Sequence, residues 1–486
     1  MQHTQEQHAI ITCQAHTIIV QALAGTGKTS TLIGYVQARP TWRFLYLAYN
    51  KAIAEEVAQR FPANVVSCTV HSLAYRAYGA KYQHKLGNNR LRDLTASLNL
   101  SSTDTARVKR ALQAVNDWLV SDVDDLSAFV RKQYKRESTL TELLLDAPTI
   151  WGMMLDANNH TIKMPHDGYL KLYQMSKPVL EYDALLLDEA QDSNAVTIAL
   201  VRSAQCAYKV IIGDSHQAIY RFRGATDALA DFAKLDSAAL FSLTHSFRFS
   251  QAIADYATRI LQNMKGEDKA LVGAGAAGEV QVYDSVDALP QYTTILARNN
   301  FSLFNIALEQ VSAGRKVYFC GGVARYDLDL LHAIIDLYQQ RHVKHVFISK
   351  FSSYVQLRAY ARDAEESDVI LACNMIDEYG AGTLRGLLHE LVQMDAYISA
   401  APAQRLFECQ FQLVSCHRSK GLQFKRVAVW DDFTALEEMR LADCADRYRA
   451  GRLSEFEADE WVDEVNLLYV ACTRATQVIF VPKLVV

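Results

Sequence analysis

The stretch that decides the fold is VQALAGTGKTSTL at residues 20–32, which begins at the end of the apolar run HTIIV. It is typical of a buried strand, a glycine-rich turn and the start of a helix. Gly25 and Gly27 let the backbone curl so that its N–H groups face an anion, and the helix dipole adds positive charge. In such a loop Lys28 reaches the β- and γ-phosphates of a nucleotide and Thr29 binds Mg²⁺. An ordinary strand–helix turn with a solvated lysine is the alternative.

A second acidic stretch strengthens the nucleotide interpretation. ALLLDEAQD at 184–192 sets Asp188 and Glu189 at the end of an apolar strand. An acid at that place holds Mg²⁺ through water, and its neighbour orients or deprotonates the attacking water. A helix N-terminus rich in acids is the simpler explanation of this motif alone. The two motifs together predict an ATP hydrolase with Mg²⁺ as its metal.

The bulk properties bound the class of protein. A chain of 486 residues predicts two or more domains. Its net charge of −4 requires that any nucleic-acid binding be local to a groove. The nine cysteines form no C-x-x-C pair, which argues against a zinc module or a disulfide framework. With a polar N-terminus and no run of ~18–20 apolar residues, we expect a cytoplasmic protein without a membrane partner, in a bacterial, phage or plasmid-encoded setting.

Short apolar runs alternate with helix-like sequence along most of the chain. Such runs predict parallel strands buried on both faces, and hence a doubly wound α/β fold. Two helix-rich stretches interrupt the alternation, and the last apolar run ends so near Val486 that we expect no appended nuclease. The predicted organisation is a first α/β domain (1–76 and 165–245), its helical insertion (77–164), a second α/β domain (246–325 and 405–486) and its reduced helical insertion (326–404).

The motifs that follow make a resemblance specific. DEAQD and then IIGDSHQAIYRFRGA at 211–225 resemble motifs II and III of UvrD/Rep-type superfamily 1A DNA helicases. Other stretches resemble further motifs of that family in order: TQEQHAII (4–11), AYNKAIAEE (48–56), TVHSLA (69–74), THSFRFSQAI (244–253), SCHRSKGLQFKRVAV (415–429) and EVNLLYVACTRA (464–475). The resemblance implies two RecA-like P-loop motor domains with parallel sheets. Ala22, in place of the first loop glycine, is common in this superfamily.

Two further stretches resemble the F-box DNA helicase branch: MPHDGYLKLYQMSKP at 164–178 and WDDF at 430–433. Since the sequence has no extra N-terminal region for an F-box, we expect a member of that branch without one.

The resemblance implies a set of nucleotide contacts. Gln7 would read adenine, Phe247 would stack on it, and Gln423 would touch the ribose where many relatives carry a glutamate. Gln217 would sense the γ-phosphate, and Arg248 and Arg474 would act as arginine fingers. The phosphate loop would contribute Ala24, Gly25, Thr26, Gly27, Lys28, Thr29 and Ser30.

The resemblance also implies contacts with a DNA strand. Phe222 would stack on a base, although a core phenylalanine is the alternative. His166 and Tyr169 belong to the branch-specific stretch, where a structural role is equally open. The remaining expected contacts are Asn50, Thr69, His71, Arg223 and His417.

These inferences predict an ATP-dependent 3′-to-5′ translocase or helicase on single-stranded DNA. Its expected partners are single-stranded DNA and tailed or forked duplex DNA, with recombinase filaments or a partner nuclease as further possibilities. It would unwind DNA or strip proteins from it in repair, recombination or replication. An RNA-directed motor and an ATPase subunit of a defence or regulatory complex are the alternatives.

Overall fold

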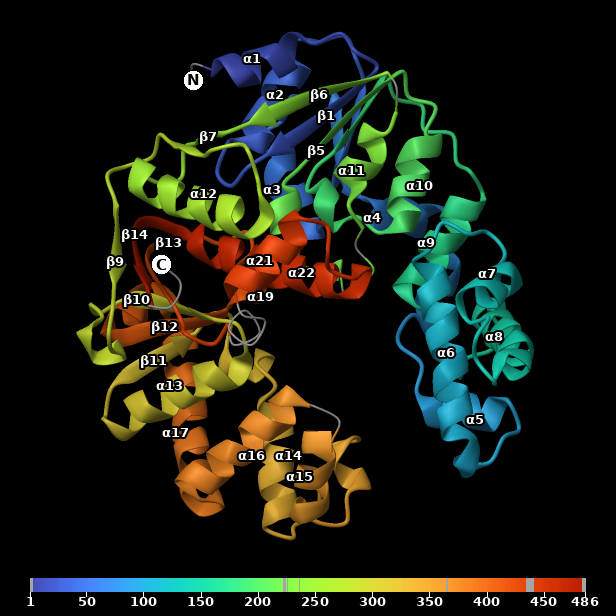
Figure 1. Ribbon diagram of the computed structural model, residues 1–486. Coiled ribbons are helices and arrows are strands. Elements are labelled where there is room, and N and C mark those ends of the chain that lie inside the picture. Colours follow the sequence, from blue (N-terminus) through green and yellow to red (C-terminus); the bar gives the residue numbers. More distant parts are fainter. Residues whose placement is uncertain are drawn as a thin grey trace. The chain divides into compact units, whose positions relative to one another are not determined.

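The computed structural model describes residues 3–221, 224, 226–235, 237–363, 366–433 and 441–482 (Figure 1). The chain divides into two compact units, residues 1–244 and 245–486. Each unit is built around a six-stranded, wholly parallel sheet with helices on its faces. This architecture confirms the predicted α/β class with two RecA-like domains.

The sheet of the first unit has the strand order β3-β2-β4-β5-β1-β6. Every neighbouring pair is parallel, so the carboxyl ends of all six strands meet at one edge. The strands β2 and β4 are buried at every position, as their continuous apolar sequence requires. The strands are β1 (Thr17–Ala22), β2 (Phe44–Ala48), β3 (Val65–Thr69), β4 (Ala184–Leu187), β5 (Tyr208–Gly213) and β6 (Ala238–Leu243).

Alternate strand residues send side chains to two separate cores. Ile18 and Val20 pack with α1, α2 and α3 on one face, whereas Ile19 packs on the other face with α4 and α10. This is the period-2 geometry of a strand. The helices beside the sheet are α1 (Gln5–Thr12), α2 (Lys28–Gln37), α3 (Lys51–Ala58), α4 (Val70–Ala77), α9 (His166–Met175), α10 (Ala195–Ser203) and α11 (Ala228–Ala233).

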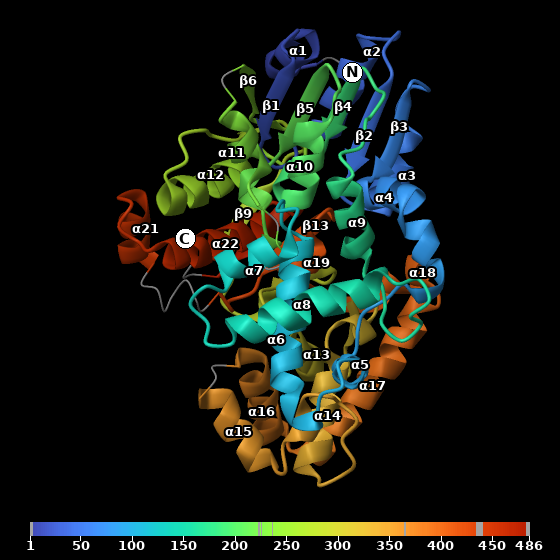
Figure 2. The same cartoon turned by 90° about the vertical axis from the view of Figure 1, so that its right-hand side faces the viewer.

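Between α4 and α9 the chain is helical, and α6 packs against α5, α7 and α8 (Figure 2). Trp118 of α6 is almost fully buried at their centre. Lys171 of α9 is also fully buried, and its ammonium group donates to the carbonyl oxygens of Ser121 and Val123 at 2.8 and 2.7 Å. The elements are η1 (Gly79–Lys85), α5 (Leu91–Ser97), η2 (Ser102–Asp104), α6 (Thr105–Leu119), α7 (Leu126–Gln133) and α8 (Leu140–Leu155).

The sheet of the second unit has the order β11-β12-β10-β13-β14-β9, again with parallel pairs. Its strands are β9 (Glu279–Val282), β10 (Thr293–Ala297), β11 (Lys316–Phe319), β12 (Cys409–Ser415), β13 (Phe424–Val429) and β14 (Ala475–Val481), and a separate pair joins β7 (His245–Ser246) to β8 (Val272–Gly273). The helices near the sheet are α12 (Gln251–Lys265), η6 (Val286–Ala288), α13 (Asn300–Ser312), α19 (Cys416–Ser419), α21 (Leu441–Arg449) and α22 (Glu455–Cys472).

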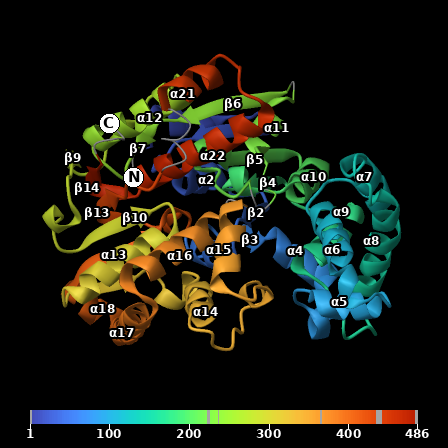
Figure 3. The same ribbon diagram turned by 60° about the horizontal axis from the view of Figure 1, so that its bottom comes forward.

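A second helical region follows β11, and α17 connects it to the sheet by packing on β11 and α13 (Figure 3). Its elements are η7 (Val323–Arg325), α14 (Leu328–Tyr338), η8 (Ile348–Lys350), α15 (Tyr354–Asp363), α16 (Ser367–Tyr379), α17 (Ala381–Ser399), α18 (Pro402–Arg405) and η9 (Leu406–Glu408). We propose that the two helical regions are the insertions of their units, with the boundaries expected from the sequence. Within the described ranges, no helix combines the length and the apolarity that a membrane span requires.

The close packing around Gly213 allows the fold of the first unit to be tested. A Cβ atom at Gly213 would lie 2.3 Å from Oε1 of Gln191 and 3.0 Å from the backbone nitrogen of Ala190. We therefore expect Gly213→Ala to cost about 1–3 kcal/mol, the usual range for overpacking, and to lower the thermal unfolding midpoint.

Gly152→Ala is the matched control, because this helical glycine has open space around its Cβ position. It should keep or raise the midpoint, since alanine favours helices by about 0.5–1 kcal/mol over glycine. Equal midpoints for the two variants in calorimetry would contradict the close packing at Gly213.

Candidate functional site

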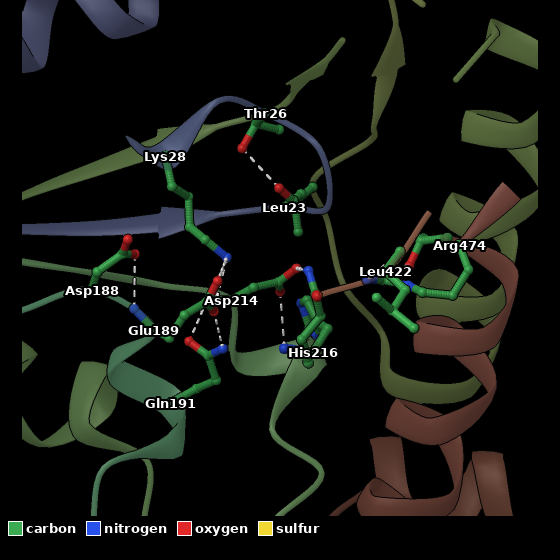
Figure 4. Close-up of polar contacts among 12 residues, drawn as sticks. Leu23, Thr26, Lys28, Asp188, Glu189, Gln191, Asp214, His216, Leu422 and Arg474 are labelled. Atoms are coloured by element: carbon green, nitrogen blue, oxygen red, sulfur yellow. Dashed lines mark hydrogen bonds and ion pairs between the residues drawn. The ribbon is translucent and has the colours of Figure 1, made fainter. Parts of the chain in front are cut away.

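The loop after β1 has the backbone that an anion-binding turn needs. Gly25 and Gly27 have φ of 76° and 81°, in the left-handed region that favours glycine. Gly27 is the cap residue of α2 and has no side chain that could accept from the first N–H groups of the helix. Thr26 is buried and its hydroxyl donates to the carbonyl oxygen of Leu23 at 2.7 Å, which fixes the turn (Figure 4).

The expected adenine reader lies against this loop. Gln7 is 3% exposed, and its Nε2 donates to the carbonyl oxygen of Thr26 at 3.3 Å. Its Oε1 accepts from the backbone N–H of Thr4 in a capping box at the start of α1. Thr29 and Ser30 lie half-buried in the first turn of α2. Ala24 is fully buried within the loop.

Lys28 forms the central ion pair of the site. Its Nζ lies 3.0 and 3.1 Å from the two carboxylate oxygens of Glu189 (Figure 4). Burial alone would lower the pKa of Lys28, but the charges of Glu189, Asp188 and Asp214 outweigh it, and the pKa is raised. Lys28 therefore stays a cation, as phosphate binding requires.

Asp188 follows β4 and is 5% exposed. Its Oδ1 accepts from the backbone N–H of Glu189 at 2.8 Å, and its Oδ2 accepts from the hydroxyl of Tyr46 at 2.6 Å. Burial, and then the charge of Glu189, raises the pKa of Asp188 to about 6, while the Tyr46 bond opposes that rise. The Thr29 hydroxyl and the Asp188 carboxylate are the hard oxygen ligands that suit Mg²⁺. In the described part of the chain, no cluster of three or more His, Cys, Asp or Glu forms another metal site.

Gln191 joins the acidic motif to the segment after β5. It is fully buried; its Nε2 donates to Glu189 at 2.6 Å, and its Oε1 accepts from the backbone N–H of Asp214 at 2.9 Å. Asp214 in turn accepts from Nε2 of Gln217 at 2.6 Å. Hydrogen bonds thus run without a break from Lys28 to Gln217, which lies in η4 (Ser215–Gln217). Neither Tyr46 nor Gln191 was expected as a site residue from the sequence.

Glu189 has a strained backbone. Its φ of 50° and ψ of 45° are left-handed, which is uncommon for a residue with a side chain. Such a conformation costs about 1–3 kcal/mol and persists only where the surroundings impose it. Here η3 (Ala190–Asp192) follows at once, and the ion pair with Lys28 and the bond from Gln191 hold the side chain.

Four expected nucleotide residues belong to the second unit. Arg474 is 1% exposed and donates through Nε to the carbonyl oxygen of Val470 at 2.9 Å. Arg248 donates through Nη1 to the carbonyl oxygen of Thr473 at 2.9 Å, so the two arginines meet at the end of α22. Phe247 is 49% exposed, and Gln423 is exposed near Leu422, whose carbonyl oxygen accepts from Arg474 at 3.4 Å.

A pocket of about 350 Å³ lies beside the acidic motif in the first unit. Thr69 and His71 line it, as do Asp188 and Glu189, so expected strand contacts and expected catalytic acids share one cavity. Tyr49 and Tyr220 also line it, and their rings stack with centroids 5.8 Å apart and planes 7° apart. No role for Tyr220 was expected from the sequence, although it lies inside the quoted motif.

The other expected strand contacts are placed differently. Tyr169 is 3% exposed, its hydroxyl lies 2.8 Å from Nδ1 of His166, and its ring meets that of His71 edge to face. Asn50 caps α3 and does not line the pocket. His417 lies in α19 of the second unit. Phe222 and Arg223 lie outside the described residues.

The WDDF stretch has a structural role. Asp432 accepts from the backbone N–H groups of Arg298 and Asn299 at 2.8 and 3.1 Å, and so holds the turn that precedes α13. Burial raises the pKa of Asp432 to about 6, against the effect of those hydrogen bonds.

Comparison with known proteins agrees with this geometry. A family model described as an AAA domain matches residues 5–223. F-box DNA helicase 1 of Gallus gallus is 30% identical over 97% of this chain and 48% of its own length. F-box DNA helicase protein 1 of Schizosaccharomyces pombe is 27% identical over 97% of this chain and 56% of its own length. A probable DNA helicase II homolog of Rickettsia conorii is 25% identical over 54% of this chain and 45% of its own length.

The chain spans about half the length of the two F-box helicases that it matches. The matches to them run along nearly the whole of this chain, through both units and not only through the phosphate loop. They confirm the resemblance expected from the motifs: the chain is related to the superfamily 1 DNA helicases and, among them, to the F-box helicase branch.

Proposed function

We propose that this chain is an ATP-dependent translocase or helicase that moves 3′ to 5′ along single-stranded DNA. The unbroken path of contacts from Lys28 through Glu189, Gln191 and Asp214 to Gln217 carries the proposal. Glu189 also lines the pocket that holds Thr69 and His71, so a change at the phosphate loop reaches the expected strand contacts. The AAA-domain match supports nucleotide use, and the relatives' names support DNA as the substrate.

The ion pair between Lys28 and Glu189 determines how ATP would bind. The phosphates of ATP compete with Glu189 for Lys28, because both offer negative oxygens to the same ammonium group. Once Glu189 leaves Lys28, its carboxylate is available to orient the attacking water. Mg²⁺ held at Thr29 and Asp188 would neutralise charge on the phosphates.

Gln191 links movement of Glu189 to the segment after β5. Its amide bonds Glu189 on one side and the backbone of Asp214 on the other, so movement of Glu189 disturbs Asp214 and then Gln217. Arg248 and Arg474 keep the role that the resemblance implies, which is to stabilise charge on the transferred phosphoryl group. Such arginines contribute roughly 10³–10⁵-fold in rate in other NTPases.

The proposal predicts that single-stranded DNA stimulates ATP turnover. Poly(dT) should raise the steady-state rate at least tenfold over the basal rate, whereas poly(U) should raise it less. A rate that is the same with and without poly(dT) would refute the motor proposal, and stronger stimulation by poly(U) would favour an RNA-directed motor.

Lys28→Ala is the control for this measurement. Without the ammonium group it should lose turnover with either polymer, yet still bind single-stranded DNA at low salt, because Lys28 does not line the pocket. Unaltered turnover would show that the ATPase belongs to a contaminant or to another site.

The direction of travel can be tested on partial duplexes. A duplex with a 3′ single-stranded tail should be unwound in an ATP-dependent way, and the same duplex with a 5′ tail should not. A preference for the 5′ tail would overturn the polarity. Displacement of a protein block from the tail without duplex unwinding would assign protein stripping as the output.

Tyr46→Phe should shift the pH dependence of turnover. The Tyr46 hydrogen bond favours the charged carboxylate of Asp188 and lowers its pKa, against burial. Without that bond the pKa of Asp188 rises further, so the acid limb of the rate profile should move to higher pH. The half-saturating Mg²⁺ concentration should rise several-fold at pH 7, since more Asp188 is protonated. The acid limb and the half-saturating Mg²⁺ concentration are both measured in ATPase assays between pH 5.5 and 8.5.

Tyr35→Phe is the matched control. Tyr35 is a fully buried tyrosine of the same unit whose hydroxyl has no hydrogen-bond partner among the described residues. Its replacement should leave the pH profile and the Mg²⁺ dependence unchanged. Equal shifts in both variants would show that the Tyr46 effect is one of core packing.

A further inference from the structure

A fully buried lysine of α9 holds the turn between α6 and α7. The ammonium group of Lys171 donates to the carbonyl oxygens of Ser121 and Val123 at 2.8 and 2.7 Å, and it lies 4.9 Å from the ring centroid of Trp118. Burial lowers the pKa of Lys171 to about 8, against the charges of two nearby aspartates, so the group is still mainly a cation at pH 7. We call residues 120–124 the clamped turn.

Two further hydrogen bonds fix the clamped turn. Gln174 of α9 donates through Nε2 to Oδ1 of Asp124 at 2.8 Å, and Nε1 of Trp118 donates to the carbonyl oxygen of Val123 at 2.8 Å. Residues three apart lie on one face of a helix, so Lys171 and Gln174 hold the turn from the same face of α9. The helix α9 also packs on α4 and α10 beside the sheet, and on α6 of the helical region.

The clamped turn touches the segment that follows η4. Val120 packs on Gly224, where a Cβ atom would lie 3.2 Å from Cγ2 of the valine. Gly224 has a φ of 80°, and its N–H donates to the carbonyl oxygen of Arg221 at 2.8 Å. The N–H of Thr226 donates to the carbonyl oxygen of Ser193 at 2.9 Å. Gly224 is thus held against the clamped turn, and Thr226 is held against the segment after the acidic motif.

These contacts begin and end at the pocket beside the acidic motif. Tyr220 and Ser193 line that pocket, so both neighbours of the Gly224 turn form part of its wall. Asp167 of α9 lines it too, and its Oδ1 lies 3.1 Å from Nε2 of His71. Asp167 and Lys171 are four residues apart, which again places them on one face of the helix. One helix therefore contributes to the wall of the pocket and, one turn further on, supplies the lysine that holds the clamped turn.

We propose that Lys171 is a positioning residue for this pocket: through the clamped turn it holds the segment of Tyr220 in place, so that the helical region sets how tightly a strand is bound. Lys171 does not itself line the pocket, and its effect passes through the backbone carbonyls, Val120 and Gly224. A cation suits this task because hydrogen bonds from a charged donor are stronger than those from a neutral one. The inference rests on the proposed function only in taking a strand as the occupant.

The alternative is a purely structural lysine, and Lys85 of η1 provides the matched control. It is also fully buried, and its ammonium group donates to the carbonyl oxygens of Met153 and Asp156 at 3.1 and 2.8 Å. Lys85 does not line the pocket. Lys85→Met and Lys171→Met therefore remove the same kind of interaction from the same unit, but only Lys171→Met releases the clamped turn.

The first measurement is amide hydrogen exchange by mass spectrometry, without DNA or nucleotide. In Lys171→Met, peptides that contain Gly224 and Thr226 should exchange about tenfold faster, because hydrogen bonds to a charged group contribute about that factor to a local opening equilibrium. Lys85→Met should leave the exchange of these peptides unchanged. Slow exchange of β1 and β4 in both variants establishes that the sheet is folded.

The second measurement is the affinity for a short oligo(dT), by fluorescence anisotropy. Lys171→Met should raise the dissociation constant several-fold, and Lys85→Met should not. Val120→Ala removes the contact with Gly224 and keeps the charge of Lys171, so it should act in the same direction. The double variant Lys171→Met, Val120→Ala should bind no more weakly than Lys171→Met alone, since both changes break one path of contacts.

Unchanged exchange at Gly224 and Thr226 in Lys171→Met, or equal acceleration in Lys85→Met, would overturn the proposal. Faster exchange with unaltered oligo(dT) affinity, or additive effects in the double variant, would also overturn it. If Lys171→Met loses the slow exchange of β1 and β4, Val120→Ala alone decides the outcome. If the unmodified chain does not bind oligo(dT), the proposed motor fails, whereas the exchange data still decide whether Lys171 holds the wall of the pocket.

Discussion

The ion pair between Lys28 and Glu189 is the interaction on which the first unit depends. Lys28 is a cation in a largely buried setting, and a buried charge is tolerated only where opposite charges and hydrogen bonds compensate it. The carboxylates that compensate the charge of Lys28 lie after the ends of two different strands, β4 and β5. The loop after β1 can meet both only because β5 lies between β1 and β4 and all three run parallel. The strand order is thus a condition of the electrostatics.

Much of this could be predicted from sequence because the signals are local. The phosphate loop, the acidic motif and the apolar strands are each recognisable within about ten residues, and a parallel sheet sets the carboxyl ends of its strands along one edge. The role of Tyr46 could not be predicted in this way. Its hydroxyl reaches Asp188 because β2 pairs with β4, and Tyr46 stands beside Leu186 in that register. Gln191 was missed for the same reason, since its bond to Asp214 depends on the path of β5.

Burial was the other quantity that the sequence left open. For His166 and Tyr169 a structural role and a DNA-facing role were equally open, and Tyr169 proves to be almost fully buried with its ring against His71. Asp432 likewise belongs to a branch motif and holds a backbone turn. A motif shared with relatives therefore mixes residues that position others with residues that could meet a ligand, and only packing separates them. The roles of the individual site residues stay predictions until variants are measured.

The distribution of charge constrains how such a protein could hold DNA. The pocket with Thr69 and His71 is lined by four acidic residues, Asp167, Asp188, Glu189 and Asp192, so it does not attract phosphate at long range. A strand there must be held by stacking and short hydrogen bonds, which act only after it has arrived. In a chain of net charge −4, attraction over a Debye length of ~10 Å requires a separate cluster of uncompensated cations.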